Sequence, residues 1–481
     1  MKFLKTAAAA AISIALLAGC NDETTVNNPV APVVPVDPVV PVDPVVPVTP
    51  TEPTSVRFGT YNLSFDRTTF EALVAEMQIT APEQEALMTK WFAGTLTEEE
   101  LKVAEKVIQI RNVAAVIQTK RPAVLMMGEF NNDGLGENQD AIKGFRLNYL
   151  AVPQNGLGTT SAEKKMLEPI QFPFVENFST NTGLLSEFDL DRNGTIALPG
   201  DAWGFGFYHG QYAFGLLSQY PIDTANVRTF QNFKWKDMPG ETNPTITNCD
   251  DEKYTIPEGM KCGDEWYTAE AWAQKPLSSK NHVDAPILIP TEAGEKVVHL
   301  LLSHPTPPVF DTVTENNKML NRAEIDFWND YVANADYIYD DTGVKGGLAL
   351  DASFVIMGDL NADPENGDGF LDSIQNLMSH ERVNVVATGG IYAPNSFGST
   401  ECVALGDCGD TTYPDRITST FGLRVDHAVP SSDLNITGSG VFWPATFEEG
   451  RLLMNDERVG KYGNGKDISS DHRLVWIDTE I

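Results

Sequence analysis

The chain has 481 residues, enough for one large domain with appended segments. Hydrophobic residues make up 42% and charged residues 21%, a globular composition that excludes a largely disordered protein. Lys and Arg number 34 against 67 Asp and Glu, and the net charge of −33 disfavours a protein that binds nucleic acid mainly by covering phosphates with basic side chains. The acidity suits a soluble protein outside the cytoplasm, in which some carboxylates hold divalent cations.

Residues 1–19 have the pattern of an export signal. Two lysines precede an apolar run that ends in Leu-Ala-Gly, directly before Cys20, and the run is too short to cross a membrane. A cysteine at this place resembles a bacterial lipoprotein signal, in which Cys20 is acylated and becomes the first mature residue. The alternative is an ordinary signal with an incidental cysteine. We expect an exported, membrane-anchored lipoprotein that faces the periplasm or the cell exterior.

Residues 20–54 are predicted to form a stalk. From Pro29 to Thr54 a proline stands at every third position, and the segment PVDPVV repeats. This pattern excludes a helix or a central strand and favours an extended polyproline-II spacer. The function therefore lies in a head of residues 55–481, which we expect to be one α/β domain with loop insertions and a monomer.

The head begins with a predicted strand at 56–62. Two capping-box signals follow, Thr68 with Glu71 and Thr97 with Glu100. Apolar residues at helical spacing over 101–117 predict a helix that stops before Arg121 and Pro122. The pattern indicates further strands at 123–127, 212–218, 296–303, 354–357, 425–430 and 474–477.

Asp189, Asp191 and Asn193 form a candidate calcium loop. With Gly194 they reproduce the spacing of the first half of such a loop, in which glycine permits a sharp turn. The twelfth position from Asp189 is Gly200 rather than Glu, and no flanking helix pair is evident. Two interpretations stay open: a structural Ca²⁺ site completed by Asp201 or other residues, and an Asx-rich turn.

Four cysteines of the head fall into two close pairs, Cys249 with Cys262 and Cys402 with Cys408. In an exported protein such pairs indicate two local disulfides that staple loops. The spacings match no standard zinc site, so we expect a structural role.

Polar residues collect beside the apolar runs, usually just past their ends, where α/β proteins place ligands. Hard oxygen ligands hold Mg²⁺ or Ca²⁺, amides hold phosphate oxygens, and histidine serves as acid or base, so the set suits metal-assisted phosphoryl chemistry. Its members are Asn62, Glu129, His304, Asp359, Asn361, Asp426, Asp471 and His472.

Ordered blocks that carry these residues resemble the endonuclease/exonuclease/phosphatase superfamily with the pancreatic-deoxyribonuclease-like fold. The blocks are GTYNL, RPAVLMMGEF, GQYAFGLLSQYPI, LLLSHP, FVIMGDLNADP, RVDHAV and SSDHRLVW. The motifs GDLN and SDH are short, but together the blocks span most of the head in family order. The resemblance implies an α/β fold, a four-layer α/β/β/α sandwich of two mixed sheets flanked by helices, with the site at one rim.

The resemblance also implies roles for the strand-end residues. Glu129 would be the principal ligand of Mg²⁺, or of Mn²⁺ or Ca²⁺ in its place, with Asn62 beside it and Asp471 as a second ligand. The remaining roles are catalytic: Asp359 orients or deprotonates the attacking water, Asn361 steadies the phosphoryl oxygens, and Asp426 holds His472, which acts as base or as a charged clamp on the phosphate.

Two positions depart from the family pattern. His304 matches a position for a general acid or a phosphate contact, but Pro-Thr-Pro-Pro follows it, which leaves its role open. His427 stands after Asp426 where an aromatic residue is common, and we interpret it as a packing residue.

Three functions remain open at this point. The first is an extracytoplasmic, metal-dependent phosphoesterase that cleaves small phosphodiesters or phosphomonoesters through a metal-bound phosphate, an activated water and the Asp–His dyad. The second is a secreted nuclease acting on DNA or RNA, although the nearest basic and aromatic alternation, at 233–236, carries only two charges. The third is a binding lipoprotein without catalysis. We favour the first, with a small molecule as substrate.

Overall fold

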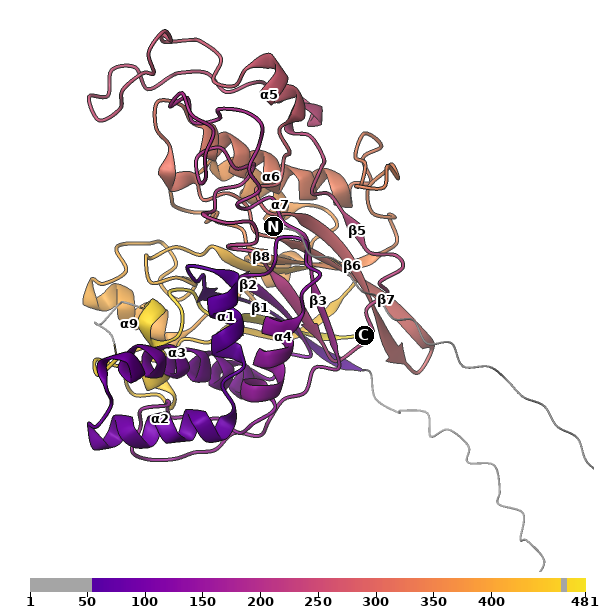
Figure 1. The fold of residues 1–481 in the computed structure, drawn as a ribbon. Helices are drawn as coiled ribbons and strands as arrows, with labels where there is room; N and C mark the ends of the chain where they lie inside the picture. Colours follow the sequence, from indigo (N-terminus) through magenta and orange to yellow (C-terminus); the bar gives the residue numbers. More distant parts are fainter. Residues whose placement is uncertain (1–53, 460–464) are drawn as a thin grey trace, which may run out of the picture. The chain divides into compact units, whose positions relative to one another are not determined.

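Two β-sheets stacked face to face form the centre of the head (Figure 1). A computed structural model describes residues 54–459 and 465–481, so the predicted signal, Cys20 and nearly all of the stalk lie outside the described residues. Among the described residues, the first sheet has the order β10-β11-β1-β2-β4-β3 and the second the order β5-β6-β7-β8-β9.

The first sheet contains six strands of the described chain: β1 (Ser55–Phe65), β2 (Val124–Phe130), β3 (Phe174–Asn177), β4 (Gly215–Ser218), β10 (Asn435–Val441) and β11 (Val475–Glu480). The second contains β5 (Arg228–Thr229), β6 (His282–Thr291), β7 (Gly294–Ser303), β8 (Ser353–Asp359) and β9 (Asp426–Pro430). Both sheets are mixed, because β1 pairs with β2 and β7 with β8 in parallel, whereas their other neighbours are antiparallel. The parallel pairs bring the carboxyl ends of neighbouring strands to one edge.

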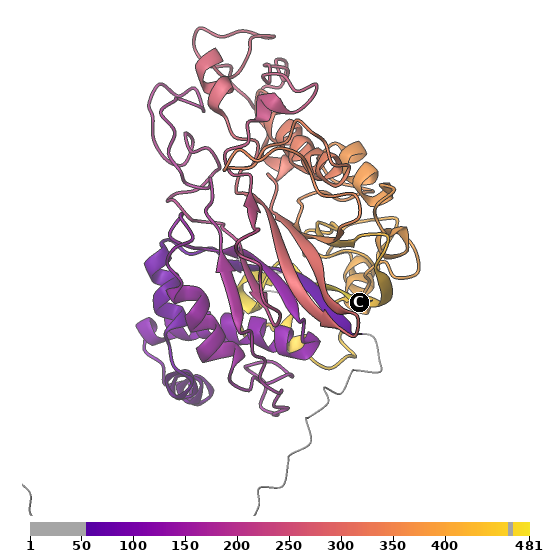
Figure 2. The ribbon, with the colours of Figure 1, turned by 90° about the vertical axis from the view of Figure 1, so that its right-hand side faces the viewer.

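Helices cover both outer faces of the sheet pair, which Figure 2 shows from the side. The first sheet carries α1 (Phe70–Met77), α3 (Glu98–Lys120) and α4 (Asp140–Phe145), with α2 (Ala81–Ala93) packed on α3. The second sheet carries α6 (Asn316–Val332) and α7 (Leu371–Ser379). The remaining α-helices of the described chain are α5 (Ala269–Gln274), α8 (Val385–Thr388), α9 (Phe397–Leu405) and α10 (Gly465–Ile468). This is the expected four-layer α/β/β/α sandwich.

Side-chain alternation along β8 shows how the layers hold together. Val355 and Met357 are buried in the cluster that includes the first sheet, whereas Phe354 and Ile356 are buried in the cluster that includes α6 and α7. Successive side chains of a strand point to opposite faces, and both faces of this strand are covered. Two apolar faces explain why the sequence here is a continuous apolar run.

The cap of α1 and the strands β4 and β6 differ from the predicted elements. The Thr97–Glu100 capping box and the helix that follows it are confirmed, but α1 is capped by Thr69, whose side chain accepts from the backbone of Ala72, and not by Thr68. The strand β6 was not predicted, because Pro286 interrupts its pattern. Residues 212–214 lie outside β4, so only the last part of the predicted strand is regular. No helix in the described ranges combines the length and apolar character that a membrane crossing requires.

Candidate active site

Asn62 joins the two sheets at the edge where the predicted site residues meet. It lies near the end of β1, and its Nδ2 donates to Oε1 of Glu129 and to Oδ2 of Asp359, both at 3.1 Å. Glu129 belongs to β2 of the first sheet, and Asp359 ends β8 of the second. One amide therefore fixes the spacing between a carboxylate of each sheet.

Three carboxylates surround an ammonium group on the first-sheet side of this edge. The Nζ of Lys466 lies 3.9 Å from Oδ1 of Asp66, 3.9 Å from Oε2 of Glu129 and 3.7 Å from Oδ2 of Asp471. Oε2 of Glu129 is buried and accepts no hydrogen bond from any residue that the structure describes. We call Asp66, Glu129, Asp471 and Lys466 the carboxylate pocket.

The donor type of the carboxylate pocket suits a hard divalent cation, although its three carboxylates are not among the described groups whose ligand atoms all lie within 4.8 Å of one another. Its donors are carboxylate oxygens, the ligands that Mg²⁺, Mn²⁺ and Ca²⁺ prefer, and an unpartnered buried oxygen of Glu129 is available for coordination. Glu129 and Asp471 would hold such an ion, with Asp66 close by. The amide oxygen of Asn62 accepts from the backbone of Ser64 at 3.1 Å, so Asn62 serves mainly to orient the two carboxylates here.

A bulge at the end of β1 locks the pocket to the segment before β11. The pairing of β1 with β2 shifts register between Asn62 and Phe65, and Ser64 lies there with a φ of 52°. The hydroxyl of Ser64 donates to Oδ1 of Asp471 at 2.5 Å and lies 2.8 Å from the hydroxyl of Ser470. Ser470 in turn donates to the carbonyl of Asn62 at 2.6 Å. The irregularity thus places Asp471 beside Glu129.

Electrostatics in the carboxylate pocket follow from burial and opposite charge. Burial raises the pKa of Glu129 to about 7 even with Lys466 nearby. Burial would lower the pKa of Lys466, but Glu129, Asp471 and Asp66 raise it above its ordinary value. Burial would also raise the pKa of Asp471, yet His472, Lys466 and Ser64 hold it below its usual range. The three carboxylates thus favour the protonated form of Lys466.

On the second-sheet side, His472 lies between two carboxylates. Its Nδ1 lies 2.9 Å from Oδ2 of Asp426, at the start of β9, and its Nε2 lies 3.6 Å from Oδ2 of Asp359. Burial would lower the pKa of His472, but Asp426 and Asp359 raise it to about 10. Burial would raise the pKa of Asp359, but His472, His304 and Asn62 bring it well below its ordinary range. A charged imidazole and an ionised carboxylate thus stand side by side.

His304 is held next to Asp359 by a close approach of β7 and β8. Its Nε2 lies 3.4 Å from Oδ2 of Asp359, and a side chain at Gly358 would place its Cβ 1.9 Å from the carbonyl oxygen of Ser303. Only glycine permits this spacing. Burial, with a smaller contribution from Lys280, lowers the pKa of His304 to about 4, so the ring is neutral at neutral pH. His304 is therefore a neutral hydrogen-bonding group and no cationic clamp.

The proline-rich segment after His304 is anchored to α6. The backbone N–H of Thr306 donates to Oε2 of Glu324 at 2.6 Å, and the carbonyl of Thr306 accepts from Asn321 at 2.9 Å. The carbonyl of Pro305 accepts from Nδ2 of Asn361 at 3.0 Å. The departure from the family pattern is thus tied to the helical layer, and it leaves His304 in the site.

Asn361 and His427 lie beside the centre of the site. Asn361 adopts a φ of 50° and donates its backbone N–H to Oδ1 of Asp359 at 2.9 Å, so its amide is at the rim but is engaged with Pro305. His427 is buried, and its Nε2 lies 2.8 Å from the carbonyl of Ala362. Burial lowers the pKa of His427 to about 3, which agrees with a packing role.

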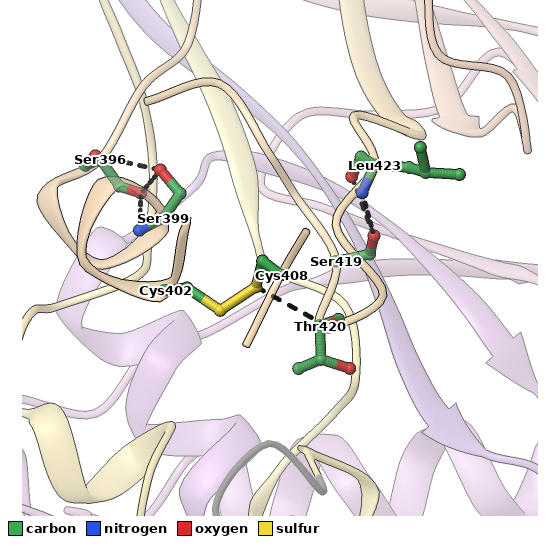
Figure 3. The surroundings of a disulfide bond; sticks show 7 residues. All are labelled: Ser396, Ser399, Cys402, Cys408, Ser419, Thr420 and Leu423. Atoms are coloured by element: carbon green, nitrogen blue, oxygen red, sulfur yellow. Dashed lines mark hydrogen bonds between the residues drawn. A yellow bond between two sulfur atoms is a disulfide. The ribbon is translucent and has the colours of Figure 1, made fainter. Parts of the chain in front are cut away.

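The disulfide between Cys402 and Cys408 lies against the loop that holds Ser419 and Thr420 (Figure 3). Sγ of Cys408 lies 3.7 Å from the carbonyl oxygen of Thr420, a packing contact because a disulfide sulfur carries no proton. The backbone of Thr420 donates to the carbonyl of Asp471 at 2.8 Å, and Ser419 pairs with His472. This disulfide therefore contacts a residue, Thr420, that is hydrogen-bonded to Asp471 of the site.

The second staple and the candidate calcium loop belong to insertions. Cys249 and Cys262 are bonded between β5 and β6, with Cα atoms 5.8 Å apart. Asp189, Asp191 and Asp201 offer oxygens within 4.8 Å of one another. Asn193 contacts this group, since its Nδ2 donates to Oδ2 of Asp191 at 2.8 Å, while its Oδ1 accepts from the backbone of Thr195 at 2.9 Å.

Two residues of the carboxylate pocket were not predicted. Asp66 lies four residues after Asn62 along the same extended segment, and Lys466 lies five residues before Asp471 in α10. Neither stands in a recognised block. A search for metal ligands also passes over lysine, because its side chain is positively charged. Only the folded structure shows that Lys466 lies among these carboxylates.

Comparison with known proteins assigns the head to a family. The model of the "Endonuclease/Exonuclease/phosphatase family" matches residues 59–472. A comparison with curated proteins gave no match.

Among solved structures, the chain is similar to an endonuclease/exonuclease/phosphatase from Beutenbergia cavernae, at 13% identity over 89% of this chain and 72% of that one, with a TM-score of 0.36. It is similar to beta toxin from Staphylococcus aureus, at 12% identity over 88% and 99%, with a TM-score of 0.36. It is also similar to the human Nocturnin catalytic domain, at 10% identity over 89% and 93%, with a TM-score of 0.33.

Proposed function

Because the chain belongs to the endonuclease/exonuclease/phosphatase family, we propose that it is a divalent-metal-dependent hydrolase of small phosphodiesters or phosphomonoesters. Members of this family act on phosphoesters and typically depend on divalent metals. The observation that carries the proposal is the meeting of Glu129 and Asp471 with Asp359, Asp426 and His472 at one edge, joined by Asn62. A cation bound there would neutralise phosphate charge and polarise its ester bond.

The residues around Asp359 have distinct tasks in this proposal. Asp359 is ionised and accepts a proton from, or orients, the attacking water. His472, held by Asp426, keeps its charge and stabilises the negative charge that develops on the phosphoryl oxygens. His304 donates or accepts a hydrogen bond as a neutral ring, and Asn361 would turn from Pro305 toward a phosphoryl oxygen. Each group acts over the short distances that separate it from Asp359.

The surroundings of residues 233–236, where basic and aromatic residues alternate, favour a small substrate over nucleic acid. Phe233 and Trp235 are buried in the core under α6, so they are not available to stack on bases. Lys236 lies 2.6 Å from Oδ1 of Asp237, which offsets its charge. With a net charge of −33, the protein offers a phosphate chain little attraction outside the metal pocket.

Export and anchoring form part of the proposal. The signal pattern of residues 1–19, Cys20 and the stalk support a lipoprotein whose head lies outside the cytoplasm, and the two disulfides suit an oxidising compartment. Acylation of Cys20 is checked by mass spectrometry of the mature protein from its host membrane.

The experiment that tests the function compares three substrates with the purified protein: an aryl phosphodiester, an aryl phosphomonoester and plasmid DNA, each with Mg²⁺, Mn²⁺, Ca²⁺ or chelator. We expect chelator-sensitive cleavage of a small ester with the plasmid left intact. Rapid plasmid degradation would instead identify a nuclease. No cleavage of any substrate with any of the three metals would contradict the proposal and favour a binding lipoprotein.

A further inference from the structure

Lys466 occupies the space beside the oxygens that a divalent cation would need. Its Nζ lies within 3.9 Å of a carboxylate oxygen of Asp66, of Glu129 and of Asp471. A cation that coordinated Oε2 of Glu129 and Oδ2 of Asp471 would therefore lie against the ammonium group. Two cations at this separation repel strongly even near a protein surface. The metal and the lysine thus compete for the same carboxylates.

The pocket is built to receive one cation or the other. The carboxyl groups of Asp66, Glu129 and Asp471 are largely withdrawn from solvent, with 26%, 14% and 21% of each side chain exposed, so three ionised groups so close together are costly unless a positive charge is near. The side chain of Lys466 is 46% exposed, which leaves it a path to solvent. A short helix, α10, carries it on the same segment as Asp471. The lysine is thus tethered beside the pocket whatever position its ammonium takes.

We propose that Lys466 is a tethered competitor of the divalent metal, which neutralises the carboxylate pocket in the metal-free protein and is displaced when the metal binds. Lys466 thereby sets how much metal the enzyme needs, and it prevents mutual repulsion of Asp66, Glu129 and Asp471 when metal is scarce. The inference rests on the proposed function, because it takes the pocket to be the metal site.

The test measures metal binding directly. Mn²⁺ is titrated into the full chain, and free Mn²⁺ is followed by electron paramagnetic resonance, for wild type, Lys466→Met, Lys466→Arg and Glu129→Gln. Lys102→Met is the matched control, because Lys102 pairs on the surface of α3 with Glu98 and its loss changes the net charge equally. Thermal unfolding in chelator and in saturating Mn²⁺ accompanies each titration.

We expect Lys466→Met to bind Mn²⁺ at least ~10-fold more tightly than wild type, a conservative figure for removal of a like charge about 4 Å from the ion. Lys466→Arg and Lys102→Met should stay within ~3-fold of wild type. In chelator the melting temperature of Lys466→Met should fall, and Mn²⁺ should restore it. If Lys466→Met folds only with Mn²⁺, the external ion has replaced the lysine, which also supports the proposal. If it does not fold with Mn²⁺ either, Lys466→Gln takes its place in the titration.

Two results would overturn the proposal while the proposed function stands. Unchanged or weaker Mn²⁺ affinity in Lys466→Met would show that the lysine does not compete. A rise in KM alone, with unchanged Mn²⁺ affinity, would make Lys466 a phosphate contact instead. If wild type shows no Mn²⁺ site that Glu129→Gln removes, both the inference and the proposed function fail.

Discussion

The two sheets bring different chemistry to the same edge. The first supplies the carboxylate pocket, in which Glu129 and Asp471 share Lys466, and the second supplies Asp359 and Asp426 around an imidazole. Asn62 connects them through one amide. His472 itself follows Asp471 in the segment before β11, and it reaches across to these two carboxylates. We call Asp359, Asp426 and His472 the second-sheet half. In the proposed function the carboxylate pocket binds the cation and the second-sheet half carries the proton or charge chemistry, so substitutions in one half should leave the other half folded.

The largest effect is expected from the first-sheet half. Glu129→Gln removes the charge of the proposed principal metal ligand, so kcat/KM should fall by at least ~10²–10³-fold. Steady-state hydrolysis of an aryl phosphodiester in Mg²⁺ measures this loss. The melting temperature should change little, because the glutamine keeps the bond from Asn62. Near-full activity of this variant would remove Glu129 from the site.

The second-sheet half should give a loss of different character. His472→Gln should lower kcat by ~10²-fold or more, since the charged imidazole is lost, while the affinity for Mn²⁺ stays within a few fold of wild type. Asp426→Asn should give a smaller loss, because His472 stays in place but loses its nearest negative partner. A parallel loss of Mn²⁺ binding in His472→Gln would contradict the separation of the two halves.

The two disulfides allow a further comparison, because one lies beside the site and the other lies in an insertion. Replacement of either pair by alanine should cost roughly 2–3 kcal/mol of unfolding free energy, as loops of this size do. Only Cys402→Ala/Cys408→Ala should also lower kcat, because that pair packs against Thr420 beside His472. Urea unfolding and activity at a temperature where both variants are folded separate the effects. Equal kinetics of the two variants would show that the loop needs no staple.

The smallest effect concerns acid stability of the second sheet. Burial lowers the pKa of His282 to about 4, below its unfolded value of about 6.5. The unfolded chain therefore binds the proton first, so this contribution is complete above about pH 6.5 and is lost as the pH falls toward 4. Between pH 7.5 and 5 we expect the contribution of this residue to fall by about 2 kcal/mol. Urea midpoints at pH 7.5 and 5 should fall more in wild type than in His282→Gln, and an equal fall would contradict the assignment.

Much of the site was predictable because strand ends are visible in the sequence. Asn62, Glu129 and Asp359 each stand at the end of an apolar run, and parallel pairing brings such ends together. Asp426 stands before an apolar run rather than after one. It reaches the same edge because β9 runs antiparallel to β8, which sets Asp426 opposite Asp359. For these residues the local sequence pattern therefore indicated both the polar side chain and its position at the end of a strand.

Features that depend on distant packing were not predictable. Lys466 joins the pocket only because α10 packs against α3, which brings its side chain near Asp66 just after β1, and no local pattern marks that contact. The strand β6 escaped detection because Pro286 and the buried Asp284 break its apolar pattern. In the structure β5 pairs with β6 only at Val283 and Asp284, so Pro286 lies beyond this ladder, next to an isolated bridge between Ile222 and Ile287. Oδ1 of Asp284 lies 2.7 Å from Nδ1 of His299. Both irregularities are compensated by contacts across the sheet.

A double-mutant cycle tests most directly whether the two halves form one site. kcat/KM for an aryl phosphodiester is measured for wild type, Glu129→Gln, His472→Gln and the double variant. Groups that act together on one reacting phosphate lose activity non-additively, so the double variant should lie within ~10-fold of the weaker single variant. Losses that multiply in full would contradict a single site, as would a Glu129→Gln variant that retains wild-type activity.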